Sequence, residues 1–84
     1  MIIHELKIEK HYLKHLMSRD KKSEIRFNDR DYQKDDILRF YNSVDEIEVG
    51  HLNYWVHFKI THIHSGLGMA QNYVCLSLAK VDRI

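Results

Sequence analysis

Hydrophobic and polar residues alternate with the two-residue period of a β-strand in several parts of the chain. The pattern begins at residues 2–8, and its longest run is 52–64, "LNYWVHFKITHIH", which is rich in aromatic and β-branched residues. Residues 37–43, "ILRFYNS", and 73–81, "YVCLSLAKV", predict two further strands. The last run is apolar or small on both faces, which favours a central place in the sheet.

The period changes in "KHYLKHLMSRD", residues 10–20, where apolar residues recur four apart, as on one side of a helix. We expect this helix to end near Ser18 or Arg19. A polar connection is expected at 45–50, and a loop at 65–72. The order predicts a mainly β (α+β) fold, a small barrel of about five to six strands with one N-terminal helix packed against it.

The most charged stretch, residues 19–36, contains a short strand pattern at 23–28. Alternation predicts that Ile25 and Phe27 point to the core, and that the polar residues between them face the other way. The predicted polar face consists of Glu24, Arg26 and Asn28. A mixed-charge rim surrounds it, formed by Lys21, Lys22, Asp29, Arg30 and Asp31.

Length and composition limit the possibilities. The 84 residues, 44% hydrophobic and 30% charged, predict a single domain over 1–84 with one modest core. A formal net charge of +1 argues against unspecific duplex binding, yet a few charges are enough to recognise one nucleotide. No apolar run predicts a membrane span or a signal peptide, so a cytoplasmic location is expected. Cys75, the single cysteine, rules out an internal disulfide and reads as a small buried hydrophobe.

The chain has seven histidines, a residue type that commonly binds metal ions. His11 and His15 are spaced for one helix face, and His62 and His64 for one strand face. No carboxylate is spaced to complete either pair, and His57 has the opposite parity unless a bulge intervenes. Scattered surface histidines explain the pattern, and neither a metal nor a cofactor is predicted.

The segment "RDKKSEIR", residues 19–26, resembles the signature G-x-K-x-x-E-x-R of the ASCH domain, a branch of the PUA-like β-barrels. Lys21, Glu24 and Arg26 occupy its polar positions, and Arg19 stands in place of the glycine. "EIRFNDRDY" is similar to a bacterial and phage subfamily of unknown function, in which a Gly-Asp turn follows. "IHELKI" and the "YVxLS" pattern extend the likeness to nearly the whole chain. Asp35 replaces the turn glycine.

The resemblance implies binding of RNA or a nucleotide-like ligand. Arg26 offers a fork for phosphate or a base edge, Lys21 a mobile charge, and Glu24 an acceptor for an exocyclic amino group. Tyr32 and Trp55 are the candidate stacking surfaces. The expected ligand-binding residues are Lys21, Glu24, Arg26, Asn28, Asp29, Arg30 and Tyr32. The simpler alternative is a structural network in which Glu24 and Arg26 pair with Arg30 and Asp31.

Two other functions stay open. One ASCH type is similar to amidohydrolases of N4-acetylcytidine, in which the motif lysine acts with a threonine and a distant glutamate. In such an enzyme Lys21 and Glu24 would be catalytic here, but Glu24 stands at the threonine position and the loop at 65–72 carries no carboxylate. The other is a phage protein-interaction module that binds a host protein, for which an exposed apolar patch around Tyr54 and Trp55 is expected.

Overall fold

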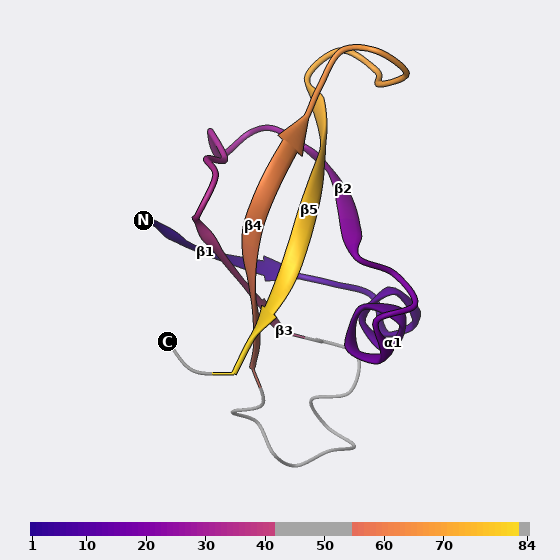
Figure 1. The fold of residues 1–84 in the computed structure, drawn as a ribbon, viewed down its shortest axis with the longest axis vertical. Coiled ribbons are helices and arrows are strands. Elements are labelled where there is room, and N and C mark those ends of the chain that lie inside the picture. Colours follow the sequence, from indigo (N-terminus) through magenta and orange to yellow (C-terminus); the bar gives the residue numbers. More distant parts are fainter. Residues whose placement is uncertain (42–54, 83–84) are drawn as a thin grey trace.

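The structure, a computed structural model, describes residues 1–41 and 55–82. This part of the chain forms a curled half-barrel sheet of five strands with one short helix after the first strand (Figure 1), which confirms the predicted fold class. The elements are β1 (Ile3–Lys7), α1 (Lys10–Ser18), β2 (Ser23–Phe27), β3 (Ile37–Tyr41), β4 (Val56–His64) and β5 (Tyr73–Val81). The predicted connection at 45–50 and residue Tyr54 lie outside the described residues.

The strand order in the sheet is β1-β3-β4-β5-β2. β1 and β3 pair in parallel, and the other neighbours are antiparallel. β5 therefore lies between β4 and β2, which confirms the central position predicted for residues 73–81. β2 is an edge strand, and among the described strands it pairs only with β5.

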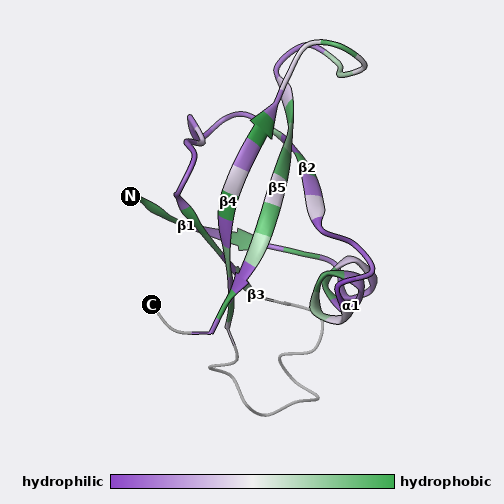
Figure 2. Cartoon of the chain, in the orientation of Figure 1, coloured by the Kyte–Doolittle hydropathy of each residue, from purple (hydrophilic) through white to green (hydrophobic). Residues whose placement is uncertain are grey.

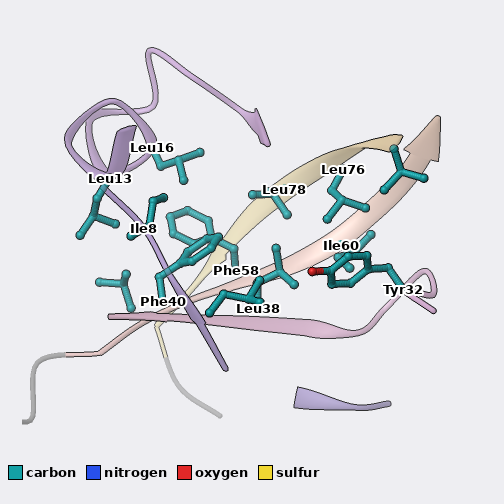
Figure 3. Close-up of a cluster of buried hydrophobic side chains, with 13 residues drawn as sticks. Ile8, Leu13, Leu16, Tyr32, Leu38, Phe40, Phe58, Ile60, Leu76 and Leu78 are labelled. Carbon is teal, nitrogen blue, oxygen red and sulfur yellow. The ribbon is translucent and has the colours of Figure 1, made fainter. Parts of the chain in front are cut away.

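The core fills the concave side of the sheet. Phe40, Phe58, Ile60 and Leu76 are fully buried there, together with Leu16 from the helix. Hydrophobic and hydrophilic bands alternate along β4 (Figure 2), because neighbouring side chains point to opposite faces of a strand. The close-up in Figure 3 shows Leu13 and Leu16 of α1 on one side of this cluster and the strand residues on the other.

The helix ends at Ser18, as predicted, and the backbone conformation of the next residue, Arg19, accounts for the glycine expected at this position of the motif. Arg19 adopts a left-handed conformation with φ 69°, and its backbone N–H donates to the carbonyl of Leu16 at 3.3 Å. Glycine takes this conformation without steric cost, which gives a physical reason for glycine at the matching position of the ASCH signature. Asp35, at the position where the resemblance leads us to expect a turn glycine, is also left-handed, with φ 76°.

A β-bulge shifts the faces of β4. Ile60 lies opposite Leu78 but His62 lies opposite Ser77, so Thr61 is an extra residue in the ladder. The shift puts His62 on the same outer face as His57, the case that the sequence left open. Within residues 1–41 and 55–82, no group of three histidine, cysteine or acidic residues is close enough to hold a metal ion.

Candidate functional site

β2 faces the opposite way from the prediction. Glu24 is buried with 7% of its surface exposed, whereas Ile25 is 58% and Phe27 49% exposed. The register is the reason: Glu24 lies opposite Leu76, and directly opposed side chains in a sheet point to the same side. The prediction that Ile25 and Phe27 enter the core is therefore wrong, and it is the polar face of β2 that turns inward.

Glu24 is the centre of a group of charged side chains that we call the inner polar cluster, formed by Lys21, Glu24 and Arg26. Lys21 Nζ donates to Glu24 Oε1 at 2.8 Å, and Arg26 Nη2 lies 3.2 Å from Oε2. Arg26 also donates to the carbonyl oxygen of Lys7 at 2.9 Å, which links β2 to the end of β1. A buried carboxylate is costly unless it is paired in this way. The motif residues thus converge on one point.

The rings of Phe40 and Phe58 form an aromatic floor beneath the cationic groups. Their centroids are 5.9 Å apart, and both side chains are fully buried. The guanidinium of Arg26 lies 5.5 Å from the Phe40 centroid, and that of Arg19 lies 5.9 Å from the Phe58 centroid. Stacking of a guanidinium on an aromatic ring is favourable and fixes its plane. Two arginines are therefore held on the core side of the sheet.

Arg19 adds a donor that the motif glycine could not supply. Its Nη2 donates to the carbonyl of Leu78 at 3.1 Å, so the side chain reaches β5. The end of the helix is capped by the backbone N–H of Arg19 and not by its side chain. Among the described residues, Arg19 Nη1 and Arg26 Nε are buried without a hydrogen-bond acceptor. Such groups are rare in folded proteins, because an unmade buried hydrogen bond costs free energy.

The remaining predicted ligand residues are split by the turn after β2. Asn28, Asp29 and Arg30 are exposed, and Asn28 Oδ1 accepts a hydrogen bond from the Tyr32 backbone N–H at 3.1 Å. Asn28 thus stabilises the turn and does not join the inner polar cluster. Glu24 finds its partners in Lys21 and Arg26, and not in Arg30 and Asp31 as the structural alternative predicted.

Tyr32 is buried, with 3% of its surface exposed, so the expectation of an exposed stacking surface is wrong for this residue. Its ring packs edge-on against His4 at 4.9 Å, and its hydroxyl points back into the hydrophobic cluster (Figure 3). Burial raises the pKa of Tyr32, while the positive charges of Arg26 and Arg30 oppose that rise. Charges of the inner polar cluster, those of Arg26 and Glu24, therefore act on the pKa of this hydroxyl.

Sequence reasoning missed a second buried carboxylate. Asp36 accepts hydrogen bonds from the backbone N–H groups of Ile2 and Gln33, both at 3.0 Å, and its Oδ2 lies 2.9 Å from His4 Nε2. Burial alone would raise the pKa of Asp36, but these hydrogen bonds outweigh it and lower the pKa. No local signal reveals the pair, because 32 residues separate His4 from Asp36.

The outer face of the sheet carries its own polar row. Arg39 donates to Glu5 Oε2 and to His57 Nε2, each at 3.0 Å, and its guanidinium lies 5.6 Å from the ring of Trp55. Burial, followed by the charges of Arg39 and Lys80, lowers the pKa of His57. Trp55, 36% exposed, belongs to this row.

An exposed apolar surface lies where β2 meets β5 on the outer face. We call it the outer β2 patch, formed by Ile25, Phe27 and Tyr73. Phe27 and Tyr73 contact edge-on at 5.4 Å, and Tyr73 is 41% exposed. An exposed apolar patch was expected around Tyr54 and Trp55, and the structure shows one at Ile25, Phe27 and Tyr73, on a different part of the sheet.

These features define a small α+β domain whose half-barrel turns a charged cluster toward its core. The chain belongs to the family described as a domain of unknown function, DUF3850, whose model matches residues 3–78. No curated protein matches the sequence. The likeness to the ASCH domain stays a prediction. No helix in the described ranges is long and apolar enough to cross a membrane.

Proposed function

We propose that the domain binds RNA or a nucleotide-like ligand through the inner polar cluster. The observation that carries the proposal is the excess of cationic donors around one carboxylate. Lys21 and Arg26 share Glu24, and within the described ranges Arg19 Nη1 and Arg26 Nε are buried without acceptors. Phosphate and base-edge oxygens are the acceptors that such donors recognise.

Structural pairing alone explains this cluster less well. A stabilising ion-pair network would be expected to satisfy its own donors, because a partly satisfied buried network destabilises the fold. Ligand-binding residues, in contrast, keep donors ready and accept the cost in stability. The resemblance of residues 19–26 to the ASCH motif supports the same conclusion.

The proposed roles follow from the contacts. Arg26 is fixed by Lys7 and by the Phe40 ring, so its remaining N–H groups have defined directions. Lys21 lies 4.5 Å from the ring of Tyr12 and supplies a more mobile charge. Glu24 orients both cations and offers its carboxylate to an amino group of a base.

Affinity measurements on matched arginine variants test the proposal. Calorimetric titration would use nucleosides, nucleotides and short RNAs, including N4-acetylcytidine. Arg26→Gln is expected to weaken binding at least about tenfold, since a hydrogen bond to a charged group contributes roughly 1.5–3 kcal/mol. Arg39→Gln is the control, because Arg39 is also ion-paired and stacked but lies on the outer face. Equal losses in both variants, or no binding by the wild type, would contradict the proposal.

Arg19→Gly separates ligand contact from stability. Glycine tolerates the left-handed conformation at φ 69°, so the helix end is retained while the buried guanidinium is removed. We expect weaker binding without a large loss of thermal stability. Unchanged affinity would remove Arg19 from the site and leave the proposal resting on Lys21 and Arg26.

Hydrolysis of a modified nucleoside is the second candidate, and the 2.8 Å contact between Lys21 and Glu24 is the observation that favours it. A lysine and a carboxylate in contact can exchange a proton during attack on an acyl group. Ser23 cannot supply a hydroxyl to them in this arrangement, because alternation along β2 places it on the face opposite Glu24. Chromatography of each titration mixture tests this candidate, since an enzyme would consume one of the compounds.

A further inference from the structure

The open edge of β2 offers hydrogen-bonding groups together with apolar side chains. The backbone N–H of Leu78 donates to Lys22 and that of Asn28 donates to Asn72, so the even-numbered residues of this strand bond to β5. By alternation, the backbone groups of Ser23, Ile25 and Phe27 point to the other side, where the carbonyl of Phe27 already accepts a hydrogen bond from the backbone N–H of Asp29 at 2.9 Å. No other strand in the described ranges pairs with that side.

The side chains next to this edge are those of the outer β2 patch. Ile25 and Phe27, both about half exposed, project from the outer face, and Tyr73 extends the surface onto β5. Natural proteins usually protect an edge strand with charges, proline or a covering element, because an apolar edge pairs readily with another strand. β2 carries apolar residues on its outer face at its middle and at its end.

Charged residues at equal distances before and after Ile25 carry opposite signs. Counting outward, Glu24 is matched by Arg26, Lys21 by Asp29, Asp20 by Arg30 and Arg19 by Asp31. An antiparallel pairing of two copies centred on Ile25 would therefore place Glu24 of each copy opposite Arg26 of the other, while the other matched residues flank the ladder on either side of β2. Opposite charges directly across a ladder stabilise it, and like charges destabilise it.

We propose that two copies of this chain associate through β2, antiparallel and centred on Ile25. In this register Ile25 faces Ile25, and Ser23 faces Phe27 of the second copy. These are the residues whose backbone groups point to the open edge, so the hydrogen-bond parity permits the register that the charge pattern selects. The two outer β2 patches become continuous, and the two sheets join into one.

The inner face gains a contact in the same arrangement. Glu24 and the second copy's Arg26 would be directly opposed in a non-hydrogen-bonded pair, where Cα atoms are about 4.5 Å apart. Within residues 1–41 and 55–82, Arg26 Nε is buried without an acceptor. The proposal needs no ligand, and its register places Glu24 and Arg26 of the inner polar cluster beside the edge of β2 at which the two copies meet.

Disulfide trapping tests the register directly. In a Cys75→Ala background, Ile25→Cys places two thiols across a hydrogen-bonded pair with Cα atoms about 5.5 Å apart, which a disulfide can span. Phe27→Cys is the control: in the proposed register the two substituted positions lie roughly 13 Å apart along the strands. Fast cross-linking of Ile25→Cys with little cross-linking of Phe27→Cys is expected. Equal rates would overturn the register.

The mass of the wild-type protein in solution tests the association itself. Light scattering over a concentration series should show a dimer whose dissociation constant rises with salt, since charge pairs at the rim are screened. Ile25→Lys should raise that constant at least about tenfold by placing like charges at the axis, while Leu67→Lys, at a 90% exposed position of the β4–β5 loop, should not. A single-chain mass throughout would overturn the proposal and leave the edge to a strand of another protein.

Discussion

Two carboxylates are buried in the part of the chain that the structure describes, and they are satisfied in different ways. Asp36 accepts from two backbone N–H groups and contacts His4, and the side chains of this pair are 4% and 6% exposed. Glu24 is held by Lys21 and Arg26, whose side chains are 31% and 23% exposed. Asp36 closes a network with two backbone N–H groups and a histidine ring, whereas Glu24 gathers charges that keep access to solvent.

The difference separates a structural role from a binding role. Asp36 ties the start of β1 to the start of β3, through Ile2 and through its own position just before Ile37. The inner polar cluster holds more donors than its carboxylate uses, and within the described ranges two buried guanidinium N–H groups lack acceptors. Stability is therefore expected to depend more on Asp36, and ligand affinity more on Arg26 and its neighbours.

Among the polar substitutions, removal of the Asp36 side chain should have the largest effect on stability. Asp36→Ala leaves the partly buried N–H groups of Ile2 and Gln33 without their acceptor and the buried His4 ring without its partner, and an unsatisfied buried group costs about 1–3 kcal/mol. We expect a loss of roughly 3 kcal/mol in the free energy of unfolding, measured by chemical denaturation. Ligand affinity should stay unchanged. A loss below about 1 kcal/mol would mean that the network contributes little.

Neutralising Glu24 should cost less. Glu24→Gln keeps the shape but leaves Lys21 and Arg26 without a counter-charge, and solvent can compensate in part because both side chains are partly exposed. We expect a loss of about 1–2 kcal/mol. Glu5→Gln is the control, since its pair with Arg39 is on the surface and such pairs contribute about 0–1 kcal/mol. A larger loss than for Asp36→Ala would assign the inner polar cluster a mainly structural role.

The pH dependence of stability should reveal the contribution of the Asp36 carboxylate as well. Because the folded pKa of Asp36 is lowered from 3.8, its contribution is complete above that value and is lost as the pH falls through the folded pKa. Asp36→Asn should therefore flatten the decline of stability below about pH 4, in urea unfolding measured across pH. Asp35→Asn, at an exposed neighbouring position, should leave the decline in place. Identical profiles for both variants would refute this assignment.

The smallest effect is expected for the apolar residues of β2. Ile25→Ala removes a side chain that is 58% exposed, so the loss of stability should be below about 1 kcal/mol. Leu76→Ala, at a fully buried position on the neighbouring strand, should cost about 2–5 kcal/mol. Thermal unfolding at low protein concentration keeps association out of the comparison. Similar losses would indicate that Ile25 is buried.

The pattern of the sequence predicts the elements well but not the face of β2. Residues 73–81 and the end of the helix are confirmed, because long periodic runs and a helix end are local features. Ile25 and Phe27 alternate with Glu24 and Arg26, and this period is the same whichever side faces inward. Only the register with Leu76 and Val74 decides the face, and that register depends on contacts about fifty residues away.

The contacts of the candidate site follow the same division between local features, which the sequence predicts, and strand register, which it does not. The motif spacing brought Lys21, Glu24 and Arg26 together correctly, since they are close in sequence. The contacts of Arg19 could not be predicted from the sequence, because its guanidinium meets Leu78 and Phe58, which lie on distant strands. The His4–Asp36 pair and the bulge at Thr61 likewise depend on how separate strands align.

Chemical-shift mapping by NMR is the most direct test of the inner polar cluster as the binding site. Amide and arginine Nε–H resonances would be followed while nucleotides and short RNAs are added. The account predicts saturable shifts at Arg19, Lys21, Glu24 and Arg26, with the outer row at Arg39 and His57 unaffected. Shifts confined to the outer face, or none with any compound, would contradict it.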